Sequence, residues 1–249
     1  MKITITDSEE QFDRVAASRI VSQICACPHS VIGLSTGRTT GNMHRGVRAM
    51  YDETKFDVSD VTFFGLDEVT GVDRNYAGAC YAMLKNEIID GLGISEDNFL
   101  MLPTKSDDFV GDCSKFKSEI ERRGGIDLLI LGLGENGHLG FNQPGSALNG
   151  TAGTASMDAA LEARIRRETG TPDEIPLGGV TLGIRDIMHA RRIILVAKGA
   201  NKADIVREML YGPVCSEVPA SVLQLHPDCE FLLDGCAAAK IDADELRQE

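Results

Sequence analysis

The sequence predicts a single α/β domain over residues 1–249, with a mostly parallel sheet and helices on both faces. Short apolar runs bounded by glycine or proline alternate with helical segments along the chain, and this alternation is typical of parallel sheets covered on both sides. Of the 249 residues, 43% are hydrophobic and 25% are charged, which suits one substantial core.

The strands are predicted from alternation at the N-terminus and from short apolar runs elsewhere. The run at residues 126–131 has almost no polar character and is bounded by glycines, so we expect a strand buried on both faces. The expected strands, in order, are Lys2–Thr6, 30–34, 61–66, 126–131, Arg192–Ala197, 221–225 and 230–233.

The helices are predicted from apolar residues at helical spacing and from caps. Asp7 or Ser8 should cap the first helix, which Pro28 ends, and Thr39 or Thr40 should cap the second. Residues 145–154 are expected to form a loop, and the last residues a polar tail or short helix. The second expected helix ends near Tyr51. Four more are expected at 75–90, 112–123, 158–168 and 184–188, and the last expected helix ends at Leu210.

The composition limits the choice of partners. A net charge of −13 and a pI near 4.8 argue against nucleic acid or an anionic membrane as the main partner. Seven scattered cysteines without a C-x-x-C pair suit a reducing compartment. We see no signal peptide and no apolar run of membrane-spanning length, so we expect a cytoplasmic protein. No second Cys/His cluster accompanies Cys25 and Cys27, so no metal site is expected.

A glycine- and threonine-rich loop links the strand at 30–34 to the next helix. Strand, loop and helix in this order present backbone N–H groups and a positive helix end to an anion. An ordinary connection is the alternative, but Arg38 adds a fixed charge and favours an anion site. The loop residues are Ser35, Thr36, Gly37, Arg38, Thr39 and Thr40.

Two adjacent carboxylates, Asp67 and Glu68, follow the strand at 61–66, where we expect a loop to begin. A carboxyl group shielded at such a strand end acquires a raised pKa and can act as a general base. The spacing leaves open which of the two points inward.

The central strand at 126–131 runs into a glycine-rich stretch that carries one histidine, His138. Loops at the carboxyl ends of parallel strands hold the ligands of open α/β sheets. Taken alone, the pattern is equally compatible with a glycine-rich turn bearing a surface histidine. Lys202 lies near an expected helix N-terminus, where a cation is disfavoured unless an anion shares the site.

Four segments together resemble the glucosamine-6-phosphate deaminase/isomerase family, including its galactosamine-6-phosphate relatives. They lie at 33–40, 66–71, 132–145 and 219–226, in the family's order and separations. The third, GLGENGHLGFNQPG, is the most specific, because the sister 6-phosphogluconolactonases continue differently after the histidine. The resemblance implies a Rossmann-like fold of the NagB/RpiA/CoA-transferase type. It also implies a reaction without metal or cofactor, in which an amino-sugar 6-phosphate and water give a ketose 6-phosphate and ammonia.

The resemblance also implies roles for individual residues. Asp67 matches the base that moves a proton between C2 and C1, and His138 the group that helps to open the pyranose ring. The loop at 36–40 and Lys202 match the phosphate site. Substrate contacts are further expected from Ser35, Glu68, Gly134, Gly137, Arg164 and Arg166, the two arginines straddling the position of the family's phosphate-binding arginine.

Two departures from the family concern the surroundings of His138. Gln143 stands where the family typically has a glutamate, and Asn136 where some members have an aspartate. An amide holds the ring by a hydrogen bond but cannot stabilise an imidazolium by charge, so a lower His138 pKa is expected. Glu135 is close enough in sequence to compensate. Residues 146–154 lack the basic residues of an allosteric site, so no such regulation is expected.

These observations favour a deaminating isomerase of glucosamine- or galactosamine-6-phosphate, with a phosphorylated amino sugar as its small-molecule partner. A 6-phosphogluconolactonase-like hydrolase or a non-deaminating sugar-phosphate isomerase is the alternative that Gln143 leaves open. A non-catalytic sugar-phosphate sensor is a third reading, which the presence of both Asp67 and His138 disfavours. The sequence leaves homo-oligomerisation open.

Overall fold

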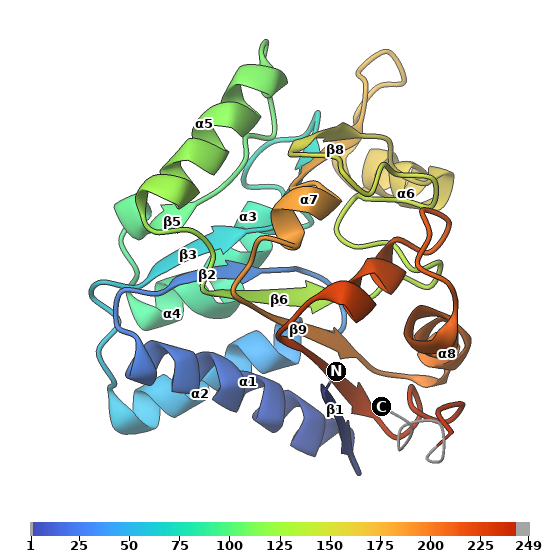
Figure 1. The fold of residues 1–249 in the computed structure, drawn as a ribbon. Helices are drawn as coiled ribbons and strands as arrows, with labels where there is room; N and C mark the ends of the chain where they lie inside the picture. The colour runs from blue at the N-terminus through green and yellow to red at the C-terminus, as the bar shows by residue number, and fades with distance from the viewer. Residues whose placement is uncertain (1, 243–249) are drawn as a thin grey trace.

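The computed structural model describes residues 2–242 and contains a seven-stranded parallel sheet with helices on both faces (Figure 1). The sheet has the order β1-β10-β9-β6-β2-β3-β5, and all of its pairings are parallel. This confirms the predicted fold class. The strands are β1 (Lys2–Thr6), β2 (Val31–Leu34), β3 (Thr62–Gly65), β5 (Phe99–Leu100), β6 (Leu128–Gly132), β9 (Arg192–Ala197) and β10 (Cys229–Asp234).

The central strand β6 shows how the two faces are built. Leu128 and Ile130 pack into the core on one face, whereas Leu129 and Leu131 pack into the core on the other, because successive strand side chains point to opposite sides. The first face is covered by α1 (Glu9–Ala26), α2 (Gly41–Thr54), α3 (Cys80–Leu84), the π-helix η1 (Lys85–Ile89) and α4 (Asp90–Leu92). The second is covered by α5 (Phe109–Arg122), α7 (Ile184–Ile187), α8 (Ala203–Tyr211) and the 3-10 helix η4 (Pro219–Leu225).

A second, smaller sheet was not predicted. Three antiparallel strands in the order β4-β8-β7 make it up: β4 (Asp67–Thr70), β8 (Gly178–Thr181) and β7 (Gly153–Ala155). The expectation of a loop beginning at Asp67 is therefore wrong. Asp67 pairs with Thr181, so its backbone is held in a ladder. Beside this sheet lies α6 (Ala159–Thr169), close to its expected bounds (Figure 1).

Three further expectations needed correction. The helix expected at 75–90 begins only at Cys80 and continues through η1 and α4 to Leu92. The strand expected at 221–225 is part of η4, which has Pro219 at its start. The expected loop at 145–154 ends where β7 begins. The remaining short 3-10 helices are η2 (Glu96–Asn98) and η3 (Ala200–Lys202). Residues 243–249, for which a tail or helix was expected, lie outside the described residues.

The strand order reverses between β2 and β6. From β2 the chain moves through β3 to β5 at one edge, and from β6 it moves through β9 to β10 in the opposite direction. Loops that leave neighbouring strands in opposite directions open a crevice at such a switch point, where α/β sheets bind ligands. The loop after β2 and the loop after β6 leave the sheet at this switch point, where such a crevice is expected.

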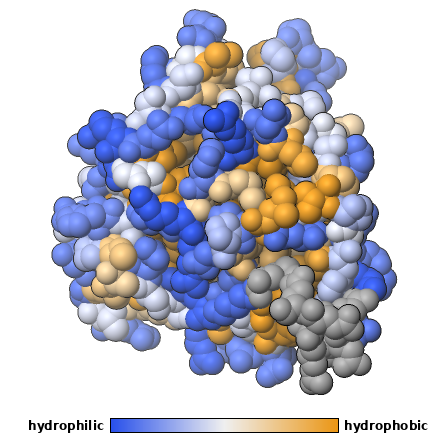
Figure 2. All heavy atoms as spheres, in the orientation of Figure 1, coloured by the Kyte–Doolittle hydropathy of each residue, from blue (hydrophilic) through white to orange (hydrophobic). Residues whose placement is uncertain are grey.

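The outer surface on the face shown in Figure 2 is mostly polar, with an apolar area near its centre, in the region of η4. Leu225 of η4 is 67% exposed. Among residues 2–242, no helix has both the length and the apolar character needed to cross a bilayer.

Candidate active site

The loop between β2 and α2 has backbone donors free to meet an anion. Gly37, at φ 128°, turns the chain so that its carbonyl accepts from the N–H groups of Thr40 and Gly41, both at 3.3 Å. Within the described part of the chain, the N–H groups of Gly37, Arg38 and Thr39 donate to no acceptor. Three free donors at the N-terminus of a 14-residue helix form a favourable anion site.

The hydroxyl groups of this loop do not all face outward. Ser35 Oγ donates to the Ile130 carbonyl at 2.9 Å, and Thr40 Oγ1 donates to the Gly37 carbonyl at 3.3 Å. These two side chains hold the loop in shape, and Thr40 occupies the N-cap without a side-chain cap bond. Arg38 is exposed and Thr39 is half-buried, so they are the side chains of the loop best placed to reach a ligand.

Asp67 is the first residue of β4, and only 9% of its surface is exposed. Burial raises the pKa of its carboxyl group to about 6, although the Cys80 thiol, which donates to Oδ1 at 3.6 Å, acts in the opposite direction. A carboxyl group with this pKa is mostly ionised at neutral pH yet accepts a proton more readily than an exposed aspartate. It is therefore suited to act as a general base.

Glu68 points the other way and has no exposed surface. Its carboxylate accepts from the backbone N–H groups of Val69, Cys80 and Tyr81 at 2.7–2.8 Å. Glu68, which belongs to β4, thus binds the free N–H groups at the start of α3. This explains why that helix begins at Cys80. Burial raises the Glu68 pKa to about 7, against these three donors, which lower it. Glu68 has no exposed surface and serves to hold the start of α3, and its contact with the substrate stays a prediction.

The His138 ring is held by an amide series, in which Asn136 bonds to the ring and Gln143 bonds to Asn136. Its ring Nδ1 lies 2.7 Å from Asn136 Oδ1, and Asn136 Nδ2 donates to Gln143 Oε1 at 3.0 Å. Since an amide oxygen only accepts, Nδ1 carries the proton, and the neutral ring keeps its lone pair on Nε2. Burial and then the Lys202 charge lower the His138 pKa, in the direction expected from the sequence.

The turn after His138 brings the histidine loop against the base. Gly140 has φ 57°, and a Cβ atom there would lie 3.2 Å from Asp67 Oδ2 and 2.7 Å from Thr181 Oγ1. Asn142 fixes the turn by donating to the carbonyls of Leu139 and Leu182 at 2.9 and 2.8 Å. Because Gly140 has no side chain, the histidine loop and the Asp67 carboxylate can lie this close together.

Lys202, at the end of η3, follows β9 and therefore lies at the same carboxyl edge of the sheet. It is half-buried, and burial lowers its pKa while the Glu135 charge raises it. Glu135 itself accepts from Asn201 Nδ2 at 2.7 Å and is exposed. The expectation that Glu135 compensates for the missing charge near His138 is therefore wrong, because it acts on the lysine. Gly134 and Gly137 are buried in the turn, where Gly137 N donates to the Gly134 carbonyl.

The two candidate arginines of α6 have different surroundings. Arg166 is bound by Glu162 at 2.7 Å and donates to the carbonyls of Pro172 and Ile175, so it closes the loop after α6. Its role in substrate binding stays a prediction. Arg164 is exposed and lies 3.9 Å from Glu168, whose carboxylate is bound by the Tyr76 hydroxyl.

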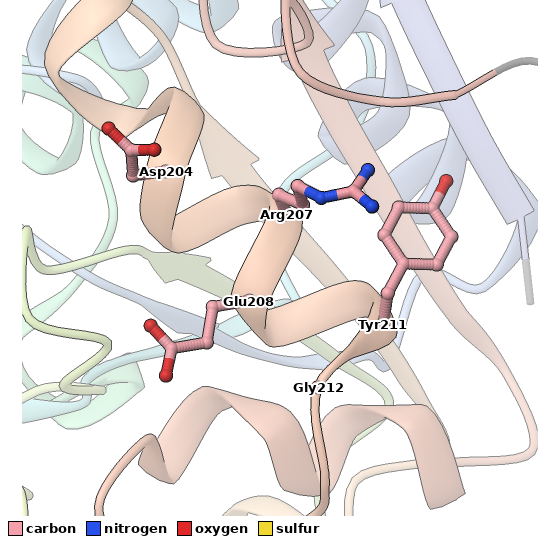
Figure 3. Close-up of a pocket in the computed structure, with 5 residues that line it drawn as sticks. All are labelled: Asp204, Arg207, Glu208, Tyr211 and Gly212. Atoms are coloured by element: carbon pink, nitrogen blue, oxygen red, sulfur yellow. The ribbon is translucent and has the colours of Figure 1, made fainter.

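Other hollows of the surface lie away from these residues. One follows the outer side of α8 and is lined by Asp204, Arg207, Glu208, Tyr211 and Gly212, with the Arg207 guanidinium directed toward the Tyr211 ring (Figure 3). Another, lined by a mixture of acidic, basic, polar and apolar residues, lies between α1 and α2. Neither includes a predicted site residue. Within residues 2–242, no three His, Cys, Asp or Glu side chains are grouped closely enough to hold a metal ion.

The sequence alone did not point to Cys80, Gly140 or Thr181. Their contacts connect positions far apart in the chain; Gly140 lies within the family segment at 132–145, whereas Cys80 and Thr181 lie in no motif. A glycine two residues after a candidate histidine was the one available signal.

The fold and the site define a Rossmann-like α/β protein with an anion loop, a buried carboxylate and a neutral histidine at its switch point. The chain belongs to the glucosamine-6-phosphate isomerase/6-phosphogluconolactonase family, whose model matches residues 7–230. The family resemblance predicted from the sequence is thereby confirmed.

Curated relatives match over nearly their full length. Glucosamine-6-phosphate deaminase of Clostridium botulinum (strain Loch Maree / Type A3) is 34% identical over 242 residues, which cover 97% of this chain and 99% of the relative. The deaminase of Thermoanaerobacter pseudethanolicus is 33% identical over 248 residues, covering 100% and 98%. A solved structure described as a monomeric glucosamine-6-phosphate deaminase superposes with a TM-score of 0.89 at 26% identity, covering 96% of this chain and 100% of the other. The fold is also shared with 6-phosphogluconolactonase from Trypanosoma brucei, at a TM-score of 0.78 and 19% identity over 97% and 98% of the chains.

Proposed function

We propose that the protein is a deaminating isomerase that converts a hexosamine 6-phosphate and water to a ketohexose 6-phosphate and ammonia. The observation that carries this proposal is the Gly140 turn, which sets the His138 loop against the buried Asp67 carboxylate. The free donors of the 37–39 loop provide the anion site on the other side of the same crevice. Relatives named glucosamine-6-phosphate deaminase at 33–34% identity support the assignment.

The phosphate group anchors the sugar in this scheme. The backbone donors of Gly37, Arg38 and Thr39 receive its oxygens, and Arg38 and Lys202 offset its charge. Anchoring at the 6-position makes the later proton transfers effectively unimolecular, because the sugar carbons are held at a fixed reach from the catalytic groups.

His138 then opens the pyranose ring. Its Nδ1–H is committed to Asn136, so Nε2 is the atom that exchanges a proton with O5. Asp67 takes the proton from C2 of the open chain and returns one to C1. Water adds at C2 of the resulting imine, and ammonia leaves to give the ketose. Each step needs a group that both accepts and donates, which a carboxyl group of pKa near 6 and a neutral imidazole provide.

The amide series next to His138 favours a second candidate, a hydrolase of the 6-phosphogluconolactone type. Lactone hydrolysis needs a neutral imidazole to activate water and no imidazolium at O5. With Gln143 and Asn136 both uncharged, the histidine is biased toward that neutral form.

A direct assay separates these candidates. The purified protein is incubated with glucosamine-6-phosphate, galactosamine-6-phosphate or 6-phosphogluconolactone, and ammonia, ketose 6-phosphate and acid release are followed. We expect ammonia and ketose in equal amounts from at least one amino sugar, and none from Asp67→Asn. Binding of either amino sugar without ammonia release would refute the deaminase proposal.

A further inference from the structure

Cys80 connects the Asp67 carboxylate with the anion loop, and the proposed reaction scheme does not use it. It is the first residue of α3 and is 5% exposed. Its backbone N–H donates to Glu68 at 2.8 Å, which fixes the position of the residue. Its side chain, in contrast, is directed at two groups of the site.

The sulfur atom lies between the proposed base and the anion loop. Cys80 Sγ is 3.6 Å from Asp67 Oδ1 and 3.2 Å from Thr36 Oγ1. An ionised carboxylate can only accept, so the thiol proton must point to Asp67. The sulfur then accepts from Thr36, whose hydroxyl proton points to it. The order Thr36 to Cys80 to Asp67 is thus fixed whenever Asp67 is ionised.

The thiol itself is unsuited to nucleophilic chemistry. Burial, and after it the charges of Asp67 and Glu68, raise the Cys80 pKa, so the sulfur stays protonated. A reactive cysteine would have the opposite surroundings. Toward Asp67, the protonated Cys80 thiol therefore acts as a hydrogen-bond donor.

We propose that Cys80 is a positioning residue, whose thiol orients Asp67 as a base and couples it to the anion loop through Thr36. This inference rests on the proposed function for its kinetic meaning, but the contacts do not depend on it. Holding Oδ1 from one side leaves Oδ2, which faces the Gly140 turn, as the oxygen that receives the substrate proton.

The test measures the ionisation of Asp67 directly, by carbon-13 NMR of its carboxyl group, in the full-length protein. Cys80→Ala removes the donor to the ionised form, so the titration midpoint should rise by about half a pH unit. Cys80→Ser keeps a donor and should restore part of the shift. Cys113→Ala is the matched control, because Cys113 is equally buried, at 2% exposed, but lies in α5; it should leave the midpoint unchanged.

Kinetics give the second readout. In Cys80→Ala the acid limb of the kcat profile should move with the NMR midpoint, lowering kcat about twofold to threefold at pH 5.5. Inorganic phosphate is the probe for the anion loop: its inhibition constant should change in Thr36→Val and Cys80→Ala, with a non-additive change in the double variant.

Either of two results would overturn the proposal. One is an Asp67 midpoint that is the same in Cys80→Ala as in Cys113→Ala. The other is strict additivity of the phosphate effects. If the wild-type protein releases no ammonia, the proposed function fails, but the NMR midpoints still decide the role of Cys80.

Discussion

Replacing Asp67 by asparagine should abolish turnover and at the same time stabilise the folded protein above pH 6. The two side chains have nearly the same shape, and an asparagine oxygen can still accept from the Cys80 thiol. The substitution therefore removes the charge and the basicity of the side chain while keeping its contacts.

The magnitude follows from the pKa of Asp67. Folding raises it from the usual 3.8 to about 6, so the folded state binds the proton more tightly than the unfolded state. Stability therefore falls as the pH rises from about 4 to about 6 and is level above that range. The full difference corresponds to about 3 kcal/mol, at 1.36 kcal/mol per pKa unit. Because the unfolded chain keeps some residual structure, about 2 kcal/mol is a realistic gain for the variant.

Urea unfolding of both proteins between pH 4.5 and pH 8 checks this prediction. The variant should gain stability relative to wild type as the pH rises toward 6.5, and the difference should then stay constant. Glu68 is present in both proteins, so its own titration largely cancels. Asp173→Asn, at a fully exposed side chain, is the control and should show no such trend. A constant difference at every pH, or retained turnover, would refute the assignment of Asp67 as a buried base.

Three further predictions concern the other parts of the site. Gly140→Ala should lower the free energy of unfolding by about 1–2 kcal/mol and kcat at least tenfold, because a Cβ at φ 57° meets neighbouring oxygens. Gly145→Ala is the control: at φ 86° in open space it has the backbone strain alone and should keep kcat. Gln143→Glu should raise the His138 pKa by about half a unit to one unit, since a charge on the order of 7 Å away contributes about 1 kcal/mol; NMR titration of the ring would show this, and an unchanged pKa would contradict the amide series. Arg38→Ala should raise KM about threefold to tenfold with kcat little changed; steady-state kinetics test this, and an unchanged KM would place the phosphate elsewhere.

The parts of the fold that could be predicted have local signals. β6 and β9 are apolar runs, and the first helix starts at Ser8, whose hydroxyl accepts from Gln11 N. The second sheet has no such signal. β4 contains two carboxylates and β8 contains two glycines, and each becomes a strand only by pairing with a segment about a hundred positions away. η4 shows the opposite error, because its apolar run looks like a strand but finds no partner in the sheet.

The same distinction applies to the site. Asp67, His138 and the loop at 35–40 stand directly after apolar strands, so their place at one edge of the sheet follows from chain order. What each side chain touches does not. Arg164 and Arg166 are both arginines of one helix, yet only the second is committed to carbonyls of the following loop. Glu68 and Asp67 are neighbours, and the alternation of β4 sends one to the helix cap and the other to the crevice.

The position of β1 in the sheet has a consequence for synthesis of the chain. In the described structure β1 pairs with β10, and their partners Lys2 and Glu230 are separated by almost the whole sequence. β1 therefore leaves the ribosome long before β10 and stays unpaired until β10 has been made. Until then the exposed edge of β1 is available to other chains. Once β1 and β10 have paired, the buried Glu230 carboxylate stabilises the pairing through its ion pairs with Lys2, Arg19 and Arg192.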